Sequence, residues 1–79
     1  PMPSLKPVPP NSLDAALAHV AAGGRLAVPT ATRVTWIDRK TVDAFDRAGA
    51  WLLKPEGDGY RLRSGKSSVF LFPGQLCFA

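Results

Sequence analysis

The sequence is poor in the residues on which most enzymes and metal proteins depend. It contains one cysteine, Cys77, and one histidine, His19, among 79 residues. A single cysteine excludes a disulfide within the chain, and these two residues cannot assemble the usual Cys/His zinc sites. No apolar run approaches the ~20 residues that cross a bilayer, and no basic segment followed by an apolar one marks a signal peptide. We therefore expect a cytoplasmic protein without a metal, a cofactor or a membrane anchor.

Carboxylates are also scarce. Only 6 residues are Asp or Glu, and Glu56 is the sole glutamate. Helix capping, helix pairing and turn formation account for Asp38, Asp43 and Asp58, respectively. No two acids are forced together by their spacing, so acid–base catalysis and magnesium binding have no support in the sequence. We expect a protein that is not an enzyme.

Proline is concentrated at one end of the chain. Residues 1–10, PMPSLKPVPP, hold five of the eight prolines. Proline removes amide donors and fixes φ, which predicts a flexible, extended N-terminal arm. Residues 11–79 are then a single small domain, because they are too few for two. An apolar content of 46% and a charged content of 20% are typical of a folded globular chain.

Two segments have the apolar spacing of short helices. The first, residues 11–22, is capped by Asn11 or Ser12 and ends at a pair of glycines. The second, residues 38–48, has Asp38 as a natural N-cap and ends at a glycine.

The rest of the chain predicts strands. These are residues 25–30, 32–37, 50–54, 60–63 and 68–72, with a short last strand at 75–78. Pro29 lacks an amide proton, so the first of them is expected at an edge. The order is α-β-β-α-β-β-β(-β). It predicts an α+β fold in which two short helices pack on an antiparallel sheet of four to six strands.

The last three strands differ between their two faces, because side chains alternate along a strand. The residues expected to face the helices are Trp51, Leu53, Tyr60 and Leu62. The residues expected to face away are Leu52, Lys54, Arg61 and Arg63. The strand 68–72 is apolar on both faces. With Val69 and Leu71 turned inward, Phe70 and Phe72 lie outside beside Arg61 and Arg63.

Aromatic rings flanked by cations on a sheet are typical of surfaces that bind single-stranded nucleic acid. Bases stack on the rings and the cations neutralise phosphates. A net charge of +4 favours an acidic partner. The predicted nucleic-acid-binding residues are Lys54, Arg61, Arg63, Lys66, Phe70 and Phe72, together with Arg33, Arg39 and Lys40 around the start of the second helix. The triplet Gly65-Lys66-Ser67 is not a phosphate loop, since a strand follows it, and it predicts a hairpin turn.

A second interpretation uses the same strand differently. A strand that is apolar on both faces is usually covered on both sides. The cover would be the first helix, the first two strands or a second copy of the chain. On this hypothesis the protein is an interaction or inhibitor domain that binds a protein partner, or homodimerises, through the apolar sheet face.

Overall fold

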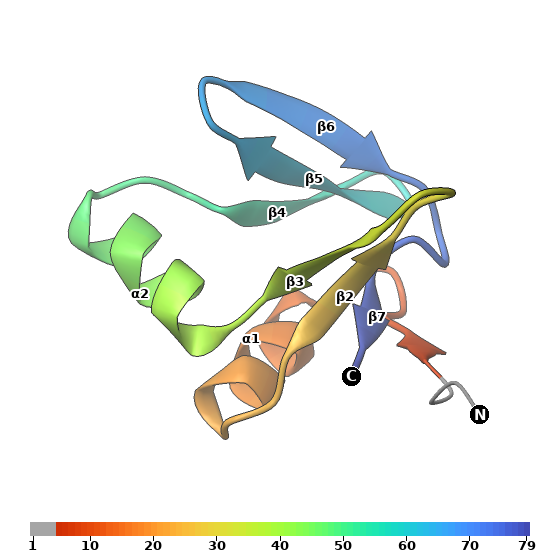
Figure 1. The fold of residues 1–79 in the computed structure, drawn as a ribbon, viewed down its shortest axis with the longest axis horizontal. Coiled ribbons are helices and arrows are strands. Elements are labelled where there is room, and N and C mark those ends of the chain that lie inside the picture. The colour runs from red at the N-terminus through yellow and green to blue at the C-terminus, as the bar shows by residue number, and fades with distance from the viewer. Residues whose placement is uncertain (1–4) are drawn as a thin grey trace.

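The computed structural model of the protein describes residues 5–79. Its elements are β1 (Lys6–Pro7), α1 (Leu13–Ala21), β2 (Leu26–Pro29), β3 (Val34–Ile37), α2 (Arg39–Arg47), β4 (Leu53–Glu56), β5 (Gly59–Ser64), β6 (Ser67–Leu71) and β7 (Cys77–Phe78). The fold is α+β, as predicted, and the strand at the C-terminal end is confirmed. The strands form two antiparallel sheets rather than one, in the orders β1-β7-β2-β3 and β4-β5-β6 (Figure 1).

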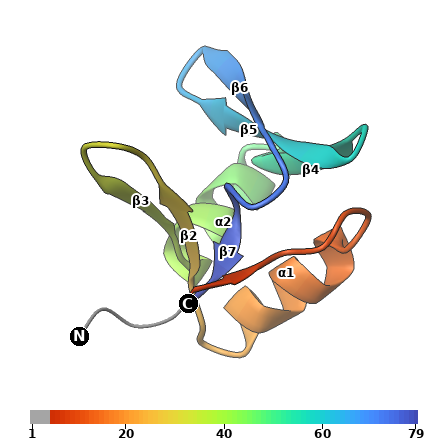
Figure 2. The same cartoon turned by 90° about the vertical axis from the view of Figure 1, so that its right-hand side faces the viewer.

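The two sheets share one hydrophobic core with the helices. In two views at right angles the three-stranded sheet is the upper layer, and β2, β3 and α1 lie beneath it (Figure 2). The core consists of Val8, Ala16, Val20, Leu26, Val28, Ile37, Leu52, Leu53, Tyr60, Leu62, Leu71 and Leu76. Each sheet turns one apolar face inward, and this is why the strands separate into two layers instead of extending a single sheet.

The expected N-terminal arm is partly integrated into the fold. Lys6 and Pro7 pair with β7, and the Val8 side chain is only 4% exposed. The Val8 amide donates a hydrogen bond to the Leu76 carbonyl (2.8 Å), and the Tyr60 hydroxyl donates one to the Pro9 carbonyl (2.6 Å). Residues 5–10 therefore pack against the domain in this structure, because the residues between the prolines keep their amides and an apolar anchor, and the flexibility of the arm stays a prediction. Residues 1–4 of that arm lie outside the described residues.

The position of β2 also differs from the expectation. It lies between β7 and β3, not at an edge. Pro29 is tolerated because β7 pairs only with Leu26 and Ala27, so the ladder on that side ends before the proline. The edge strand of this part of the sheet is β3.

The start of β4 corrects two predicted side-chain directions. The chain bends at Leu52, and the regular strand begins only at Leu53. The Leu52 carbonyl accepts a hydrogen bond from the Arg63 amide (2.8 Å). Leu52 is in the core and Trp51 lies half-buried near Arg63, the reverse of the prediction. The prediction assumes that side chains alternate between the two faces through Leu52. Because Leu52 lies in a bend and not in the strand, the side chains before Leu53 take the opposite faces from those predicted.

Both helices begin where the sequence predicts, but only one has a side-chain cap. Asp38 accepts hydrogen bonds from the Thr41 amide (2.9 Å) and hydroxyl (3.0 Å), which lower the pKa of its carboxyl group. Ser12 precedes α1 without such a bond. Its amide instead donates to the Tyr60 hydroxyl (2.8 Å), so α1 is tied to β5. Neither helix within residues 5–79 has the length and apolar character needed to cross a bilayer.

Candidate nucleic-acid interface

Two tight turns align the strands of the three-stranded sheet. Gly57-Asp58 and Gly65-Lys66 each connect neighbouring strands as two-residue loops, so the predicted hairpin at Gly65 is confirmed. Gly57 (φ 57°) and Gly65 (φ 61°) take the left-handed conformation at the first loop position, as a type II′ turn requires. These turns determine which residues lie opposite one another.

The register brings the predicted basic and aromatic residues to one face. Arg61 lies opposite Lys54 on one side and Phe70 on the other. Arg63 lies opposite Ser68. Directly opposed residues in antiparallel strands share a face. The inner face carries the pairs Leu53–Leu62, Leu62–Val69 and Tyr60–Leu71. The outer face of this sheet is therefore the one that holds the cations.

Two phenylalanines form the aromatic end of this outer face. The ring centroids of Phe70 and Phe72 are 5.2 Å apart, with an interplanar angle of 89°. Such edge-to-face pairs contribute about 0.5–1.5 kcal/mol beyond the burial of their area. Phe70 is half-buried, whereas Phe72 is 64% exposed. The guanidinium carbon of Arg61 is 6.0 Å from the centroid of Phe70. Phe72 thus presents a large apolar ring to solvent, and its neighbour Phe70 lies beside a cation.

Trp51 joins the interface although the sequence did not assign it there. The Arg63 guanidinium carbon lies 4.2 Å from the Trp51 ring centroid, and the Lys54 ammonium lies 4.6 Å from it. Cations above a tryptophan face are attracted by its quadrupole. The ring therefore holds two cations in place over the sheet. Strand alternation carried through Leu52 predicts that Trp51 faces the core, whereas the bend at Leu52 turns it to the outer face, and no other signal in the sequence identifies it.

Arg61 has a carboxylate partner on its own sheet. Its Nε donates to both Glu56 oxygens (3.0 and 2.9 Å), and its Nη2 is 2.8 Å from Glu56 Oε2. The hydrogen bonds from Arg61 lower the pKa of Glu56, and the same contact raises the pKa of Arg61. Arg61 Nη1 also reaches the Ser68 hydroxyl (3.3 Å). One cation of the interface is therefore largely neutralised, while Arg63 and Lys54 contact a ring and have no such partner among the described residues.

A hollow lies at the turn end of the same face. It has a volume of about 300 Å³ and is lined by Trp51, Arg63, Gly65, Lys66, Ser67 and Ser68. Two cations and two hydroxyl groups surround it, and these are donors that suit a phosphate or another anion.

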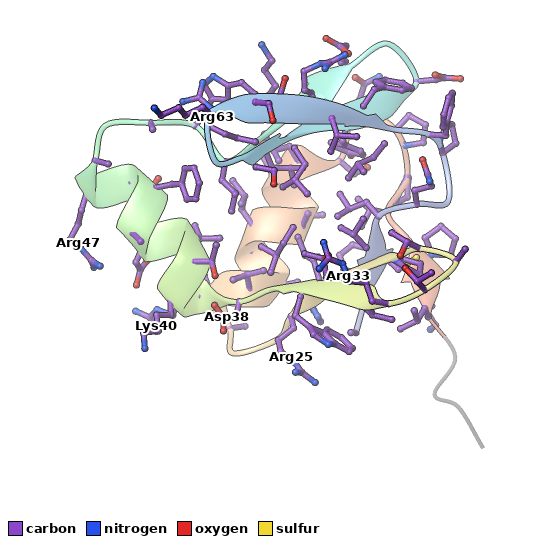
Figure 3. All side chains as sticks on the ribbon, turned by 45° about the horizontal axis from the view of Figure 1, so that its top comes forward. Arg25, Arg33, Asp38, Lys40, Arg47 and Arg63 are labelled. Carbon is purple, nitrogen blue, oxygen red and sulfur yellow. The ribbon has the colours of Figure 1, made fainter. Side chains whose placement is uncertain are left out.

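The three other predicted cations lie elsewhere. Arg33 is in the turn before β3, where its carbonyl accepts from the Thr30 amide (2.8 Å). Arg39 forms an ion pair with Asp43 on α2 (3.7 Å), and Lys40 is exposed on the same helix. Figure 3 shows Arg63 on the upper sheet, with Arg33 and Lys40 well below it on other elements. The structure does not bring these three residues together with the outer face.

Cys77 and His19, the single cysteine and histidine of the chain, both lie at the C-terminal strand β7. Within residues 5–79 no group of three or more His, Cys, Asp or Glu side chains is placed to hold a metal ion. Cys77 is buried, which raises the pKa of its thiol. His19 Nε2 lies 2.9 Å from the Ala79 carbonyl oxygen, and its ring packs against Phe78.

Fold and site together describe a small α+β protein whose three-stranded sheet has a basic and aromatic outer face. Comparison with protein families, curated proteins and solved structures finds no match for this chain. The functional conclusion therefore depends on the geometry of this surface.

Proposed function

We propose that the protein binds single-stranded nucleic acid through the outer face of the β4–β6 sheet. The observation that carries this proposal is the shared face of rings and cations. It presents Trp51, Lys54, Arg61, Arg63, Phe70 and Phe72. Stacking of bases on such rings contributes about 1–3 kcal/mol per base, and Lys and Arg release counterions from phosphates.

The two ends of the face have different roles in this proposal. At the Phe72 end, an exposed ring is available to a base, and an unpaired base is the kind that can stack on it. At the Trp51 end the ring is already engaged by Arg63 and Lys54. That end therefore binds phosphate, with Lys66 of the neighbouring turn beside the same hollow. A single strand that runs across the sheet satisfies both ends.

The test is fluorescence anisotropy with short single-stranded DNA and RNA at several salt concentrations. Affinity should fall steeply with salt, with a slope of roughly −0.7 per phosphate contact. The double variant Lys54→Ala/Arg63→Ala should bind weakly. The matched control Lys40→Ala/Arg47→Ala, which removes the same charge from α2, should keep most of the affinity. Binding that is insensitive to salt, or equal losses in both double variants, would contradict the proposal.

A protein partner is the second candidate, and exposed apolar side chains favour it. Phe72 is 64% exposed and Val69 is 47% exposed, and both lie on or next to β6. A partner held by these side chains would bind with little salt dependence, unlike nucleic acid. For either function we propose a cytoplasmic location, where a lone thiol such as Cys77 stays reduced.

A further inference from the structure

The strand β6 is an open edge with a short run of unpaired backbone groups. Among residues 5–79 it pairs only with β5 and is the last strand of its sheet, at the outside of the molecule (Figure 1). Ser64 and Ser67 flank a two-residue turn, so they form the hydrogen-bonded pair that closes it. Hydrogen-bonded and non-hydrogen-bonded pairs then alternate along the strands. Val69 and Leu71 therefore bond to β5, while the N–H and C=O groups of Ser68 and Phe70 face away from it.

Phe72 is the next residue along the chain whose backbone groups would face away from β5. The Phe72 amide donates to the side-chain oxygen of Gln75 (2.7 Å), and the Gln75 amide donates to the Phe72 carbonyl (2.9 Å). Phe72 is thereby closed to further pairing. The open part of the edge is limited to Ser68 and Phe70, each of which has one donor and one acceptor.

The other sheet edges differ in how they are protected. Lys-Pro occurs in both β1 (Lys6–Pro7) and β4 (at Lys54 and Pro55), and lysine and proline are residues that block pairing at an edge. The strand β6, Ser67–Leu71, contains neither a charge nor a proline. The edge strand β3, Val34–Ile37, also lacks a charge and a proline, and its Val34 and Trp36 are 38% and 43% exposed, with the Arg25 guanidinium 4.2 Å from the Trp36 ring centroid. The apolar side chains on and beside β6 are more exposed still, at 47% for Val69 and 64% for Phe72.

We propose that two copies of the chain pair antiparallel along β6 about a twofold axis at Val69. Ser68 then lies opposite Phe70 of the partner subunit, and each such pair exchanges both of its backbone hydrogen bonds. Val69 faces Val69 of the partner subunit in a non-hydrogen-bonded pair, where side chains come closest. The two three-stranded sheets become one continuous sheet.

Charges are compatible with this register. It brings Lys66 to the same end of the interface as the uncharged Phe72 of the partner subunit, so no like charges meet there. The neighbouring strand β5 carries Arg61 opposite Phe70 and Arg63 opposite Ser68. Arg61 is paired with Glu56, and Arg63 lies over the Trp51 ring. The far edge of each sheet is β4, which carries Lys54 and Pro55, so growth stops at the dimer. The dimer covers Val69 and adjoins Phe72, and it uses the edge of the sheet rather than its outer face.

Sedimentation velocity over a range of concentrations, without nucleic acid, tests this proposal independently of the proposed function. The mass should rise from 8.4 kDa towards twice that value. Amide hydrogen exchange gives the register. The Ser68 and Phe70 amides should exchange fast in dilute solution and slow down as concentration rises, while those of Val69 and Leu71 are protected throughout. A chain that remains at 8.4 kDa up to about 1 mM overturns the proposal.

Two variants and a matched control locate the interface. Ser68→Pro removes an outward amide and leaves the ladder to β5, and Val69→Lys places like charges at the twofold axis. Each should raise the dimer dissociation constant at least about tenfold. Val34→Lys adds the same charge to β3 and should leave that constant unchanged. Continued protection of the Leu71 amide shows that each variant is folded. A dimer that survives Val69→Lys but is lost in Val34→Lys would place the interface at β3 and contradict the proposal.

Discussion

The two sheets of this protein differ in how the side chains of their inner strands are buried. In β2 three consecutive residues, Leu26, Ala27 and Val28, are buried, so this strand is covered on both sides. In β5 the buried Tyr60 and Leu62 alternate with half-buried arginines. A strand that is covered on both sides, such as β2, contributes only to stability. A strand such as β5 leaves one face open to a ligand.

An arginine also lies over a tryptophan at each of the two sheets. Arg25 lies 4.2 Å from the Trp36 ring centroid, and Arg63 lies 4.2 Å from that of Trp51. Figure 3 places Arg63 at the top of the molecule and Arg25 at the bottom. Arg63 shares its tryptophan with Lys54 and lines one hollow with Lys66. Because both sheets have the arginine–tryptophan contact, the contact alone does not distinguish the proposed binding face, and its surroundings do.

The largest expected effect is on stability in the covered sheet. Leu26 is 0% exposed, so Leu26→Ala should lower the free energy of unfolding by about 2–5 kcal/mol through lost burial and the cavity left behind. Val69→Ala in the open sheet should change it by about 0.5 kcal/mol or less. Urea denaturation at low protein concentration measures both. Similar losses at the two positions would remove the contrast between the sheets.

A smaller effect is expected where the open sheet is tied to the N-terminal segment. The buried Tyr60 hydroxyl accepts from the Ser12 amide and donates to the Pro9 carbonyl. Tyr60→Phe leaves both groups without this partner and should cost about 1–3 kcal/mol. Hydrogen exchange at Val8 should also become faster. An unchanged unfolding midpoint with unchanged exchange would show that these bonds do not hold the segment.

On the outer face, Glu56 should compete with nucleic acid for Arg61. Glu56→Gln removes the charge that pairs with this guanidinium, so affinity for a single-stranded oligonucleotide should rise by about two- to fivefold. Asp58→Asn, two residues away in the turn, makes the same change in net charge and is the control. An equal gain in both variants would mean that net charge, and not release of Arg61, is responsible.

The smallest effect concerns the pH dependence of stability. Arg61 lowers the pKa of Glu56 below its ordinary value of 4.5 in the folded protein. The stabilisation from this pair is therefore complete above that ordinary value and is lost as pH falls through the lower folded pKa. Urea unfolding midpoints of the protein should decline over this acidic range more than those of Glu56→Gln. Parallel declines in the two proteins would show that the pair does not contribute.

Local alternation predicted the outer face of β5 and β6, because regular strands keep the phase of neighbouring side chains. The same rule failed at Trp51, since the bend at Leu52 is outside the strand. The pairing of Glu56 with Arg61 is not predictable from a strand that spans residues 50–54, because β4 continues through Pro55 to Glu56. The strands divide into two sheets because segments distant in the sequence pack around one core. No local sequence pattern predicts this division.

The most direct test of the central claim compares the two arginine–tryptophan contacts in one assay. Arg63→Ala and Arg25→Ala each remove one cation from above a tryptophan, and binding to a single-stranded oligonucleotide is measured by anisotropy at fixed salt. If the outer face of the β4–β6 sheet is the interface, Arg63→Ala should weaken binding at least about tenfold and Arg25→Ala less than about twofold. Equal losses would contradict the claim, because net charge alone would then account for the affinity.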